Sequence, residues 1–189
     1  TESVVRIASI YPTLLGTYGD GGNVLALVHR AVLHGLTTEG VDVAPGERLP
    51  RDAALCVLGG GEGTAQVAAA DALRADGGLH QAVNRGAAVL AICAGYQLIG
   101  HEFPDATGAA SPGVGILDIR TDRLPKRAVG ELLAKPGSQA PAAMTDLLTG
   151  YENHAGATHL GPDARPLAQV EFGVGNGDGS EGAISGQVL

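Results

Sequence analysis

Residues 87–92 constrain the fold of this 189-residue chain more strongly than any other segment. All six residues of the run are apolar, so it lacks the alternation of a strand with one solvated face. Such a run is typical of a strand buried on both faces, as in a parallel sheet that helices cover on both sides. Cys93 follows the run just before a helical segment expected at residues 96–101. We therefore expect an interior strand that leads through Cys93 into a helix.

Strand-like and helix-like segments alternate along the first half of the chain. The strands expected there are residues 4–10, 53–58 and 87–92. The helices expected between and after them are residues 24–32, 65–74 and 79–85. Asn23 is the expected cap of the first helix, and Gly35 lies at its expected end. The alternation predicts an α/β fold with a three-layer, doubly wound, mostly parallel sheet.

The second half of the chain has a different character, with strand-like segments joined by polar or Gly-rich connections. The strands expected there are residues 114–119, 128–134, 167–172 and 182–189. No linker or internal repeat divides the chain, so we expect a single domain over residues 1–189. The last expected strand runs to Leu189 without a closing helix, and the domain is therefore expected to lack its C-terminal segment here.

Composition excludes several classes of function. The formal net charge is −8 and no basic patch is present, which argues against binding of nucleic acid. No stretch approaches the roughly 20 apolar residues of a membrane-spanning helix. Two cysteines in a chain of this size indicate a reducing compartment, so a cytoplasmic location is expected. We expect neither a metal ion nor a cofactor on this chain.

The residues around Cys93 match a nucleophile elbow. Ala91, Ala94 and Gly95 are small, which lets the chain turn sharply between strand and helix and expose the thiol. The N-terminus of the following helix is expected to lower the pKa of this thiol, and the Ala94 N–H lies where an oxyanion would form. The other cysteine, Cys56, lies inside an apolar strand and is expected to be a buried hydrophobic residue.

A glycine-rich loop, residues 59–63, follows the expected strand at residues 53–58. Ligands of open α/β sheets bind at the carboxyl ends of the strands, where this loop and Cys93 both fall. The backbone N–H of Gly60 or Gly61 is a candidate second oxyanion donor. A glycine triplet alone is usually only a turn, but its position before a helix and its pairing with the elbow favour a role in a site.

Three phrases make the chain similar to a known family: ICAGYQ at residues 92–97, GILD at 115–118 and GYENH at 150–154. They resemble the class I, or triad, glutamine amidotransferases, in the branch that includes cobyric acid synthase. The opening, with YGDGGN at residues 18–23, resembles the glutaminase subunits of lipid II isoglutaminyl synthases. The resemblance covers nearly the whole chain and implies a flavodoxin-like fold of the class I amidotransferase type.

The resemblance implies an enzyme that hydrolyses L-glutamine to glutamate and ammonia through a thioester on Cys93. It assigns the site roles by position, with Cys93 as nucleophile, Gly60, Gly61 and Ala94 as oxyanion donors, and Arg127 and Gln97 as substrate-binding residues. The ammonia would pass to a Mur ligase-like subunit of a heterodimer, which would use ATP and magnesium to amidate the D-glutamate of lipid II to D-isoglutamine. An alternative implied role is the glutaminase part of a cobyric acid or cobyrinate amidation.

The general base and the acid of the triad stay open. The resemblance implies a base histidine a few residues beyond Leu189, with His154 a weaker alternative and His159 weaker still. The acid is open between Glu152, Asp20 and a carboxylate of the partner subunit. An amidotransferase fold that has lost its activity and serves as a binding module would also fit a missing histidine.

A third function is a cysteine hydrolase of the related deglycase type. That type places a glutamate near the thiol from the first strand, but residues 4–10 contain none. The chain also departs from the amidotransferase pattern at Gly63, where the family has Asp, and at Ala157, where it tends to have Arg. These two differences affect the anchoring of the loop at residues 59–63.

Overall fold

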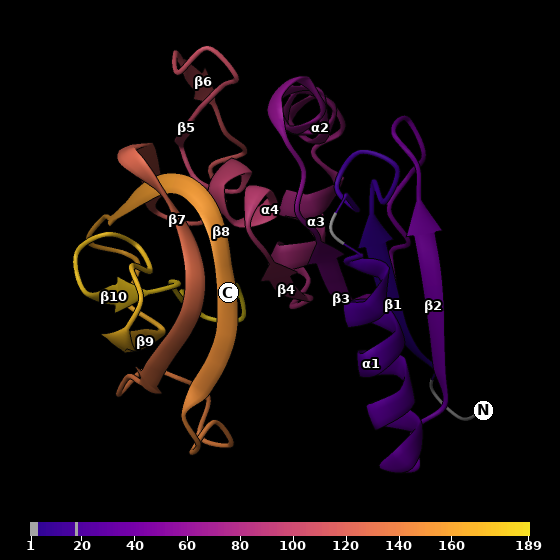
Figure 1. Ribbon diagram of the computed structural model, residues 1–189. Helices are drawn as coiled ribbons and strands as arrows, with labels where there is room; N and C mark the ends of the chain where they lie inside the picture. The colour runs from indigo at the N-terminus through magenta and orange to yellow at the C-terminus, as the bar shows by residue number, and fades with distance from the viewer. Residues whose placement is uncertain (1–3, 18) are drawn as a thin grey trace.

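The computed structural model describes residues 4–17 and 19–189, which form two sheets side by side (Figure 1). Tyr18, part of the expected YGDGGN phrase, lies outside the described residues. The first sheet has the order β2-β1-β3-β4, and all its neighbouring strands pair in parallel. Its strands are β1 (Val5–Ile10), β2 (Thr38–Val43), β3 (Ala53–Leu58) and β4 (Ala88–Ala91). We call it the parallel sheet.

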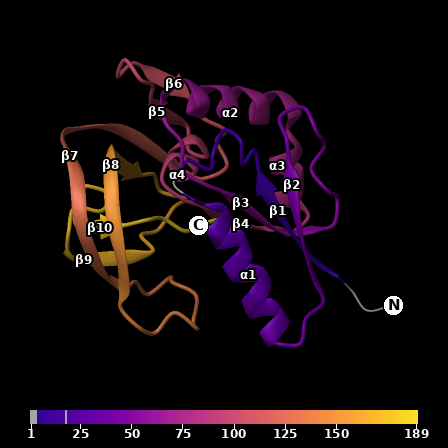
Figure 2. The same cartoon turned by 45° about the vertical axis from the view of Figure 1, so that its right-hand side comes forward.

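Helices cover both faces of the parallel sheet. They are α1 (Gly21–Leu33), α2 (Gly63–Asp76), α3 (Gly78–Asn84) and the short α4 (Ala94–Leu98). The chain moves outward from β1 to β2 through α1, and in the opposite direction from β3 to β4 through α2 and α3. Because such crossovers are right-handed, the two connections lie on opposite faces of the sheet, as Figure 2 shows for α1 and α2. The doubly wound fold expected from the sequence is confirmed.

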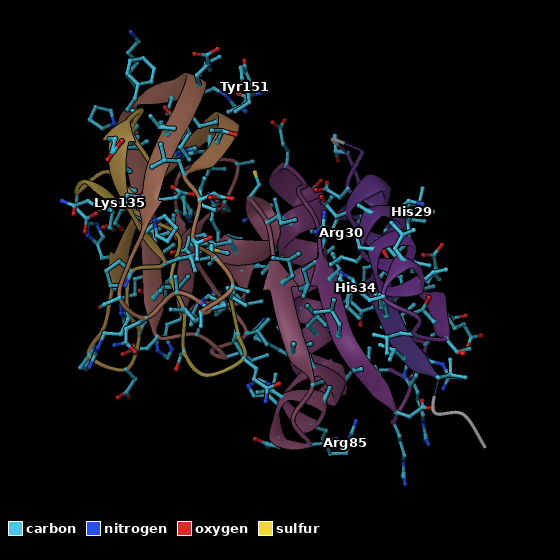
Figure 3. All side chains as sticks on the ribbon, turned by 90° about the horizontal axis from the view of Figure 1, so that it is seen from below. His29, Arg30, His34, Arg85, Lys135 and Tyr151 are labelled. Atoms are coloured by element: carbon cyan, nitrogen blue, oxygen red, sulfur yellow. The ribbon has the colours of Figure 1, made fainter. Side chains whose placement is uncertain are left out.

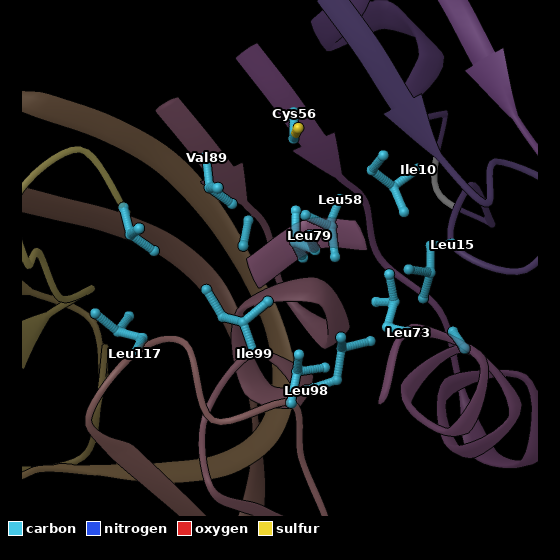
Figure 4. Close-up of a cluster of buried hydrophobic side chains, with 14 of the residues drawn as sticks. Ile10, Leu15, Cys56, Leu58, Leu73, Leu79, Val89, Leu98, Ile99 and Leu117 are labelled. Carbon is cyan, nitrogen blue, oxygen red and sulfur yellow. The ribbon is translucent and has the colours of Figure 1, made fainter. Parts of the chain in front are cut away.

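The main core lies between the parallel sheet and the helices α2, α3 and α4 (Figure 4). The strands supply Ile10, Cys56, Leu58 and Val89, each no more than 2% exposed. The facing residues are Leu73, Leu79, Leu98 and Ile99. Burial of a leucine side chain contributes about 1.5–3 kcal/mol. Cys56 is fully buried, as expected, and its burial raises the pKa of its thiol to about 11.

The second sheet has the order β10-β9-β7-β5-β6, with β8 paired to β7. Its strands are β5 (Glu102–Pro104), β6 (Ala110–Pro112), β7 (Ile119–Pro136), β8 (Leu148–Leu160), β9 (Ala168–Phe172) and β10 (Ser180–Glu181). Most pairs are antiparallel; β5 and β7 pair in parallel at one position. The long, curved β7–β8 hairpin dominates this half of the molecule in Figure 1. None of the described helices is long and apolar enough to cross a membrane.

Two of the strand predictions for the second half of the chain, residues 114–119 and 182–189, are wrong for most of their length. Residues 114–118 form a loop whose backbone bonds to the end of α4, with Val114 N–H on the Leu98 carbonyl at 2.8 Å. The apolar character of this loop reflects packing on α4, since Leu117 is fully buried. At residues 182–189, only the last three run beside β4, where Leu189 N–H donates to the Val89 carbonyl at 2.9 Å.

Other observed elements differ from the expected ones, mainly where polar residues and glycines gave no strand pattern in the sequence. β2 and β8 were not expected, since Gly40 interrupts the first and polar residues and glycines alternate through the second. The expected strand at residues 128–134 is part of the 18-residue β7. Asp20, not Asn23, precedes α1, so the expected cap is wrong. Gly35 has φ 77° and directly follows His34, the C-cap residue of α1, which confirms the expected end of the helix.

Candidate active site

Cys93 forms the junction between β4 and α4, where it takes φ 54° and ψ −112°. In the described ranges, Tyr11 is the one other non-glycine residue with a positive φ. A residue held in such a sparsely populated region costs about 1–3 kcal/mol, and such strain clusters at functional turns. The sharp turn expected from the small neighbours of Cys93 is therefore confirmed.

Gly95 lets the elbow lie directly against the glycine loop. A Cβ at this position would come within 2.6 Å of the Leu58 carbonyl oxygen and 2.9 Å of the Gly59 oxygen. The Gly95 N–H donates to the Gly59 carbonyl at 3.1 Å. Because α4 reaches the end of β3 only without a side chain here, Gly95 keeps Cys93 close to the loop.

The Cys93 thiol is partly exposed, and its pKa is raised above the ordinary value. Burial is the largest cause, and the charges of Asp20 and Glu62 add to it. The Ala94 N–H and the positive charge of Arg127 act in the opposite direction. The lowered pKa expected from the helix N-terminus is wrong for the free protein, because desolvation of the thiolate outweighs one N–H of a five-residue helix. Cys93 therefore needs a base to become a nucleophile at neutral pH.

A cavity of about 540 Å³ opens at Cys93, between the two sheets. One wall comes from the parallel-sheet half, namely Gly61, Glu62, Gly63, Thr64, Gln66, Cys93, Ala94 and Gln97. The opposite wall comes from the second half, with Arg123, Arg127, Asn153, His154, Ala155 and Gly156 among its residues. Of the predicted site residues, Cys93, Ala94, Gly61, Gln97 and Arg127 all line this cavity.

The two glycines proposed as oxyanion donors differ in their surroundings. The Gly60 N–H already donates to Asp20 Oδ2 at 2.9 Å. Gly61 lines the cavity beside Cys93, and no hydrogen bond of its N–H occurs among the described residues. The geometry therefore favours Gly61 over Gly60 as the partner of Ala94 in an oxyanion site.

Arg127 reaches across the cavity from a bulge in β7. The β7–β8 register breaks between Arg123 and Ala128, and this break redirects the intervening side chains. The guanidinium donates through Nε to Asn153 Oδ1 at 2.7 Å and through Nη2 to Glu62 Oε1 at 3.2 Å. Asn153 was not assigned a role from the sequence, although it lies in the GYENH phrase. Asn153 holds the Arg127 guanidinium at the wall of the cavity through these contacts.

Gln97 lies on the opposite wall, on α4. Its Oε1 accepts a hydrogen bond from Gln66 Nε2 at 3.1 Å, and Gln66 is 6% exposed. A Cβ on Gly156 would meet Gln97 Nε2 at 2.6 Å, so β8 packs closely on this amide. At this wall of the cavity, Gln97 of α4 therefore contacts both α2 and β8. The sequence offered no signal for Gln66, which lies in an Ala-rich helix.

His154 lines the cavity, but both its ring nitrogens are directed elsewhere. Nδ1 lies 3.0 Å from the Gly156 carbonyl, which can only accept, so Nδ1 carries the proton. Nε2 lies 3.6 Å from Glu152 Oε2. Glu152 in turn accepts the N–H groups of Val174 and Gly175. This arrangement favours a structural role for His154 over that of the base.

The other candidate groups of the triad lie away from the thiol or are otherwise engaged. His159 Nε2 lies 3.2 Å from Asp122 on the exposed side of the second sheet. His29 and His34 are exposed on the α1 side of the molecule, whereas Lys135 and Tyr151 lie on the side of the second sheet (Figure 3). Within the described part of the chain, no group of three His, Cys, Asp or Glu residues is arranged to hold a metal ion.

A second cavity of about 180 Å³ adjoins the first and shares Cys93, Gln97 and His154 with it. Its inner wall carries Glu152 and Glu181. Burial, followed by the charge of Glu152, raises the pKa of Glu181 to about 6. The thiol thus lies at the meeting point of an open cavity and a narrower acidic one.

Comparison with known proteins agrees with this site. A profile of the CobB/CobQ-like glutamine amidotransferase domain matches residues 6–189. The GatD subunit of lipid II isoglutaminyl synthase (glutamine-hydrolyzing) from Streptococcus pneumoniae is 31% identical over 178 residues, which are 92% of this chain and 66% of GatD. The corresponding subunit of Staphylococcus aureus is also 31% identical, over 87% of this chain and 65% of its own length.

Other relatives are larger or more distant. Cobyric acid synthase from Rhizobium leguminosarum is 39% identical over 160 residues, which are 79% of this chain and 31% of that enzyme. A crystal structure of a glutamine amidotransferase from Thermotoga maritima superposes with a TM-score of 0.61 at 18% identity, covering 97% of this chain and 73% of the other, and shows the shared fold. This chain thus spans just under two thirds of the GatD subunits and about a third of cobyric acid synthase. Its sequence match over residues 6–189 means that the chain belongs to the CobB/CobQ-like glutamine amidotransferase family.

Proposed function

We propose that the chain hydrolyses L-glutamine and delivers the ammonia to a synthetase partner. The observation that carries the proposal is the strained Cys93 elbow opening into a cavity that Arg127 faces from the other sheet. A nucleophile and a cation for a carboxylate on opposite walls suit a substrate with a reactive amide at one end and a charged group at the other. Glutamine has this form.

The chain's own residues suit each step of thioester chemistry. Arg127 binds the α-carboxylate with its fork, which Asn153 and Glu62 orient. The Cys93 thiolate attacks the side-chain amide carbon, and the oxygen gains the negative charge. The N–H groups of Ala94 and Gly61 stabilise that charge. The C–N bond then breaks as the nitrogen takes a proton and leaves as ammonia, and water hydrolyses the thioester to glutamate.

We propose, from the family resemblance, that the base that removes the Cys93 proton lies beyond Leu189. Residues 187–189 run parallel to β4, with the Ala91 N–H on the Leu189 carbonyl at 2.9 Å. The chain direction at Leu189 therefore points to the end of β4 where Cys93 lies. The matched residues cover 66% and 65% of the two GatD subunits. The third member of the triad stays open between Glu152, Asp20 and a carboxylate of the partner.

The favoured acceptor is the D-glutamate of lipid II, amidated by a Mur ligase-like partner that uses ATP and magnesium. The support is the match to two GatD proteins over 92% and 87% of this chain, each of which is named as a subunit of lipid II isoglutaminyl synthase. Cobyric acid synthase is more similar per residue, at 39% identity, but over 79% of this chain. Amidation of a corrinoid carboxylate is therefore the second candidate.

The test is covalent trapping of the full-length protein with the glutamine analogue 6-diazo-5-oxo-norleucine. We expect one adduct, located on Cys93 by peptide mass spectrometry, and we expect glutamine to protect the thiol. Absence of an adduct from protein purified together with its partner would exclude the glutaminase. Identification of the ATP-dependent ligase that co-purifies decides between the two acceptors.

A further inference from the structure

The carboxylate of Asp20 does not cap the backbone of α1, the helix that it precedes. An Asp in this position usually accepts an N–H of the first helical turn, but the Asp20 carboxylate caps no backbone N–H of α1. Its Oδ2 accepts the Gly60 N–H at 2.9 Å instead, 40 residues along the chain. Asn23 Nδ2 lies 3.4 Å from Oδ1. The carboxylate thus connects the start of α1 to the glycine loop.

The glycine loop is shaped to receive this carboxylate. A Cβ on Gly59 would meet Asp20 Cβ at 2.4 Å and Cγ at 2.6 Å, so Gly59 has room for Asp20 only because it lacks a side chain. A Cβ on Gly61 would meet the Leu14 carbonyl oxygen at 2.7 Å. Leu14, Leu15 and Asp20 therefore pack on the loop from one side, and the cavity lies on another.

Both peptide groups of Gly60 are held from that one side. Asp20 accepts its N–H, and its carbonyl accepts the Thr17 N–H at 3.3 Å. In a trans peptide the carbonyl and the next N–H point in opposite directions. With the Gly60 carbonyl turned toward Thr17, the Gly61 N–H is turned away from residues 14–17. Gly61 lines the cavity that contains Cys93.

We propose that Asp20 is a positioning residue, which orients the Gly61 N–H toward the oxyanion through its bond to Gly60. The inference rests on the proposed glutaminase function and assigns Asp20 a role other than the acid of the triad. Asp20 contacts neither substrate nor base in this role. The acceptor oxygen, not the charge, performs the positioning, so an amide in place of the carboxylate preserves it.

The charge of Asp20 has a separate effect, on the thiol. It is one of the groups that raise the pKa of Cys93. The titratable and charged groups facing that thiol or sharing its two cavities are Asp20, Glu62, Arg127, Arg123, Asp105, His154, Tyr96, Tyr151, Glu152 and Glu181. Neutralising Asp20 alone changes one of these charges. The pH dependence of thiol alkylation therefore reports the charge independently of the loop.

The experiment compares Asp20→Ala, Asp20→Ser and Asp20→Asn in the full-length protein with its partner. Serine begins a helix as well as aspartate does, but is too short to replace the carboxylate at Gly60. We expect kcat for glutamine to fall roughly 30-fold or more in Asp20→Ala and Asp20→Ser with KM within about threefold, since an oxyanion donor acts in the transition state. Asp20→Asn is expected to keep kcat within about threefold. The control Asp71→Ala, on the exposed side of α2, is expected to match the wild type.

A second measurement is iodoacetamide alkylation of Cys93 against pH, without glutamine. The midpoint is expected to shift to lower pH in Asp20→Asn although its kcat is kept. Unchanged kcat in Asp20→Ala and Asp20→Ser overturns the inference, and so does an equal loss of kcat in Asp20→Asn. A wild-type protein that neither hydrolyses glutamine nor reacts with the diazo analogue overturns the proposed function instead. Thermal unfolding of each variant identifies any loss of kcat that is due to misfolding.

Discussion

The two sheets of this molecule differ in how their strands are buried. In β1 and β3, the last three or four residues of each strand are buried. In the 18-residue β7, buried positions are few and scattered. Cys93 and the proposed oxyanion donors come from the first region, and Arg127 and Asn153 come from the second. In the proposed function, the chemistry that needs fixed geometry thus lies on the packed core, while the proposed substrate-binding residue lies on a bulged, exposed hairpin.

This division has a physical reason. A parallel sheet covered on both faces holds its strand ends in one arrangement, and a strained elbow persists only where surrounding structure determines it. A hairpin with one solvated face tolerates a bulge that redirects a long side chain. The comparison therefore predicts that substitutions in the two regions have different kinds of effect.

The largest effect is expected at the thiol. Cys93→Ser should reduce glutamine hydrolysis by about 10⁴-fold or more, because the hydroxyl is a far weaker nucleophile. The measurement is ammonia release by the full-length protein. Cys56→Ser is not a suitable control, because Cys56 is fully buried in the core and its substitution would lower stability. Thermal unfolding should be unchanged. Residual activity within tenfold of the wild type would assign the nucleophile elsewhere.

The next effect is the loss of folding stability, which should be larger for a substitution in the parallel sheet than for one in the second sheet. Leu58 is fully buried in the parallel-sheet core, so Leu58→Ala should lower the free energy of unfolding by about 2–5 kcal/mol. Phe172, on the second sheet, is 62% exposed, and Phe172→Ala should change it by no more than about 0.5 kcal/mol. Urea denaturation monitored by circular dichroism measures both. Similar losses in the two variants would contradict the division.

Arg127 should affect binding more than chemistry. Arg127→Ala is expected to raise KM for glutamine by about 30–100-fold and to lower kcat much less, since the α-carboxylate is bound in the ground state and in the transition state alike. Arg127→Lys keeps the charge but loses the planar fork, so an intermediate KM is expected. Arg120→Ala, on the outer side of the same strand and paired with Glu102, is the matched control. A fall in kcat at constant KM would show that Arg127 acts in the reaction itself.

The smallest effect concerns the acidic cavity. Burial raises the pKa of Glu181 from 4.5 to about 6, so the folded state holds its proton more tightly than the unfolded state. The contribution of Glu181 to stability is then fully present below pH 4.5 and is lost as the pH rises through about 6. Glu181→Gln should therefore add about 1–2 kcal/mol at pH 7.5 and little at pH 4. Denaturation at the two pH values tests this, and a variant less stable at pH 7.5 would refute it.

The sequence predicted the region whose residues carry a local pattern. The continuous apolar runs specified β3 and β4, and the small residues around Cys93 specified the strained elbow. The second sheet was predicted poorly, because Gly and polar residues in β2 and β8 hide strands that pairing partners stabilise. The apolar run at residues 114–119 misled for a related reason, since it packs on α4 as a loop.

By itself, the sequence determined that a parallel α/β sheet would present Cys93 at a turn beside a glycine loop. Only the tertiary structure decided which amides and charges face that thiol. Asp20 meets Gly60 over 40 residues, and Arg127 meets Asn153 over 26 residues and Glu62 over 65. It also decided that desolvation outweighs the helix N–H and raises the pKa of Cys93. Local patterns report which faces a segment buries, whereas these contacts depend on the relative placement of distant segments.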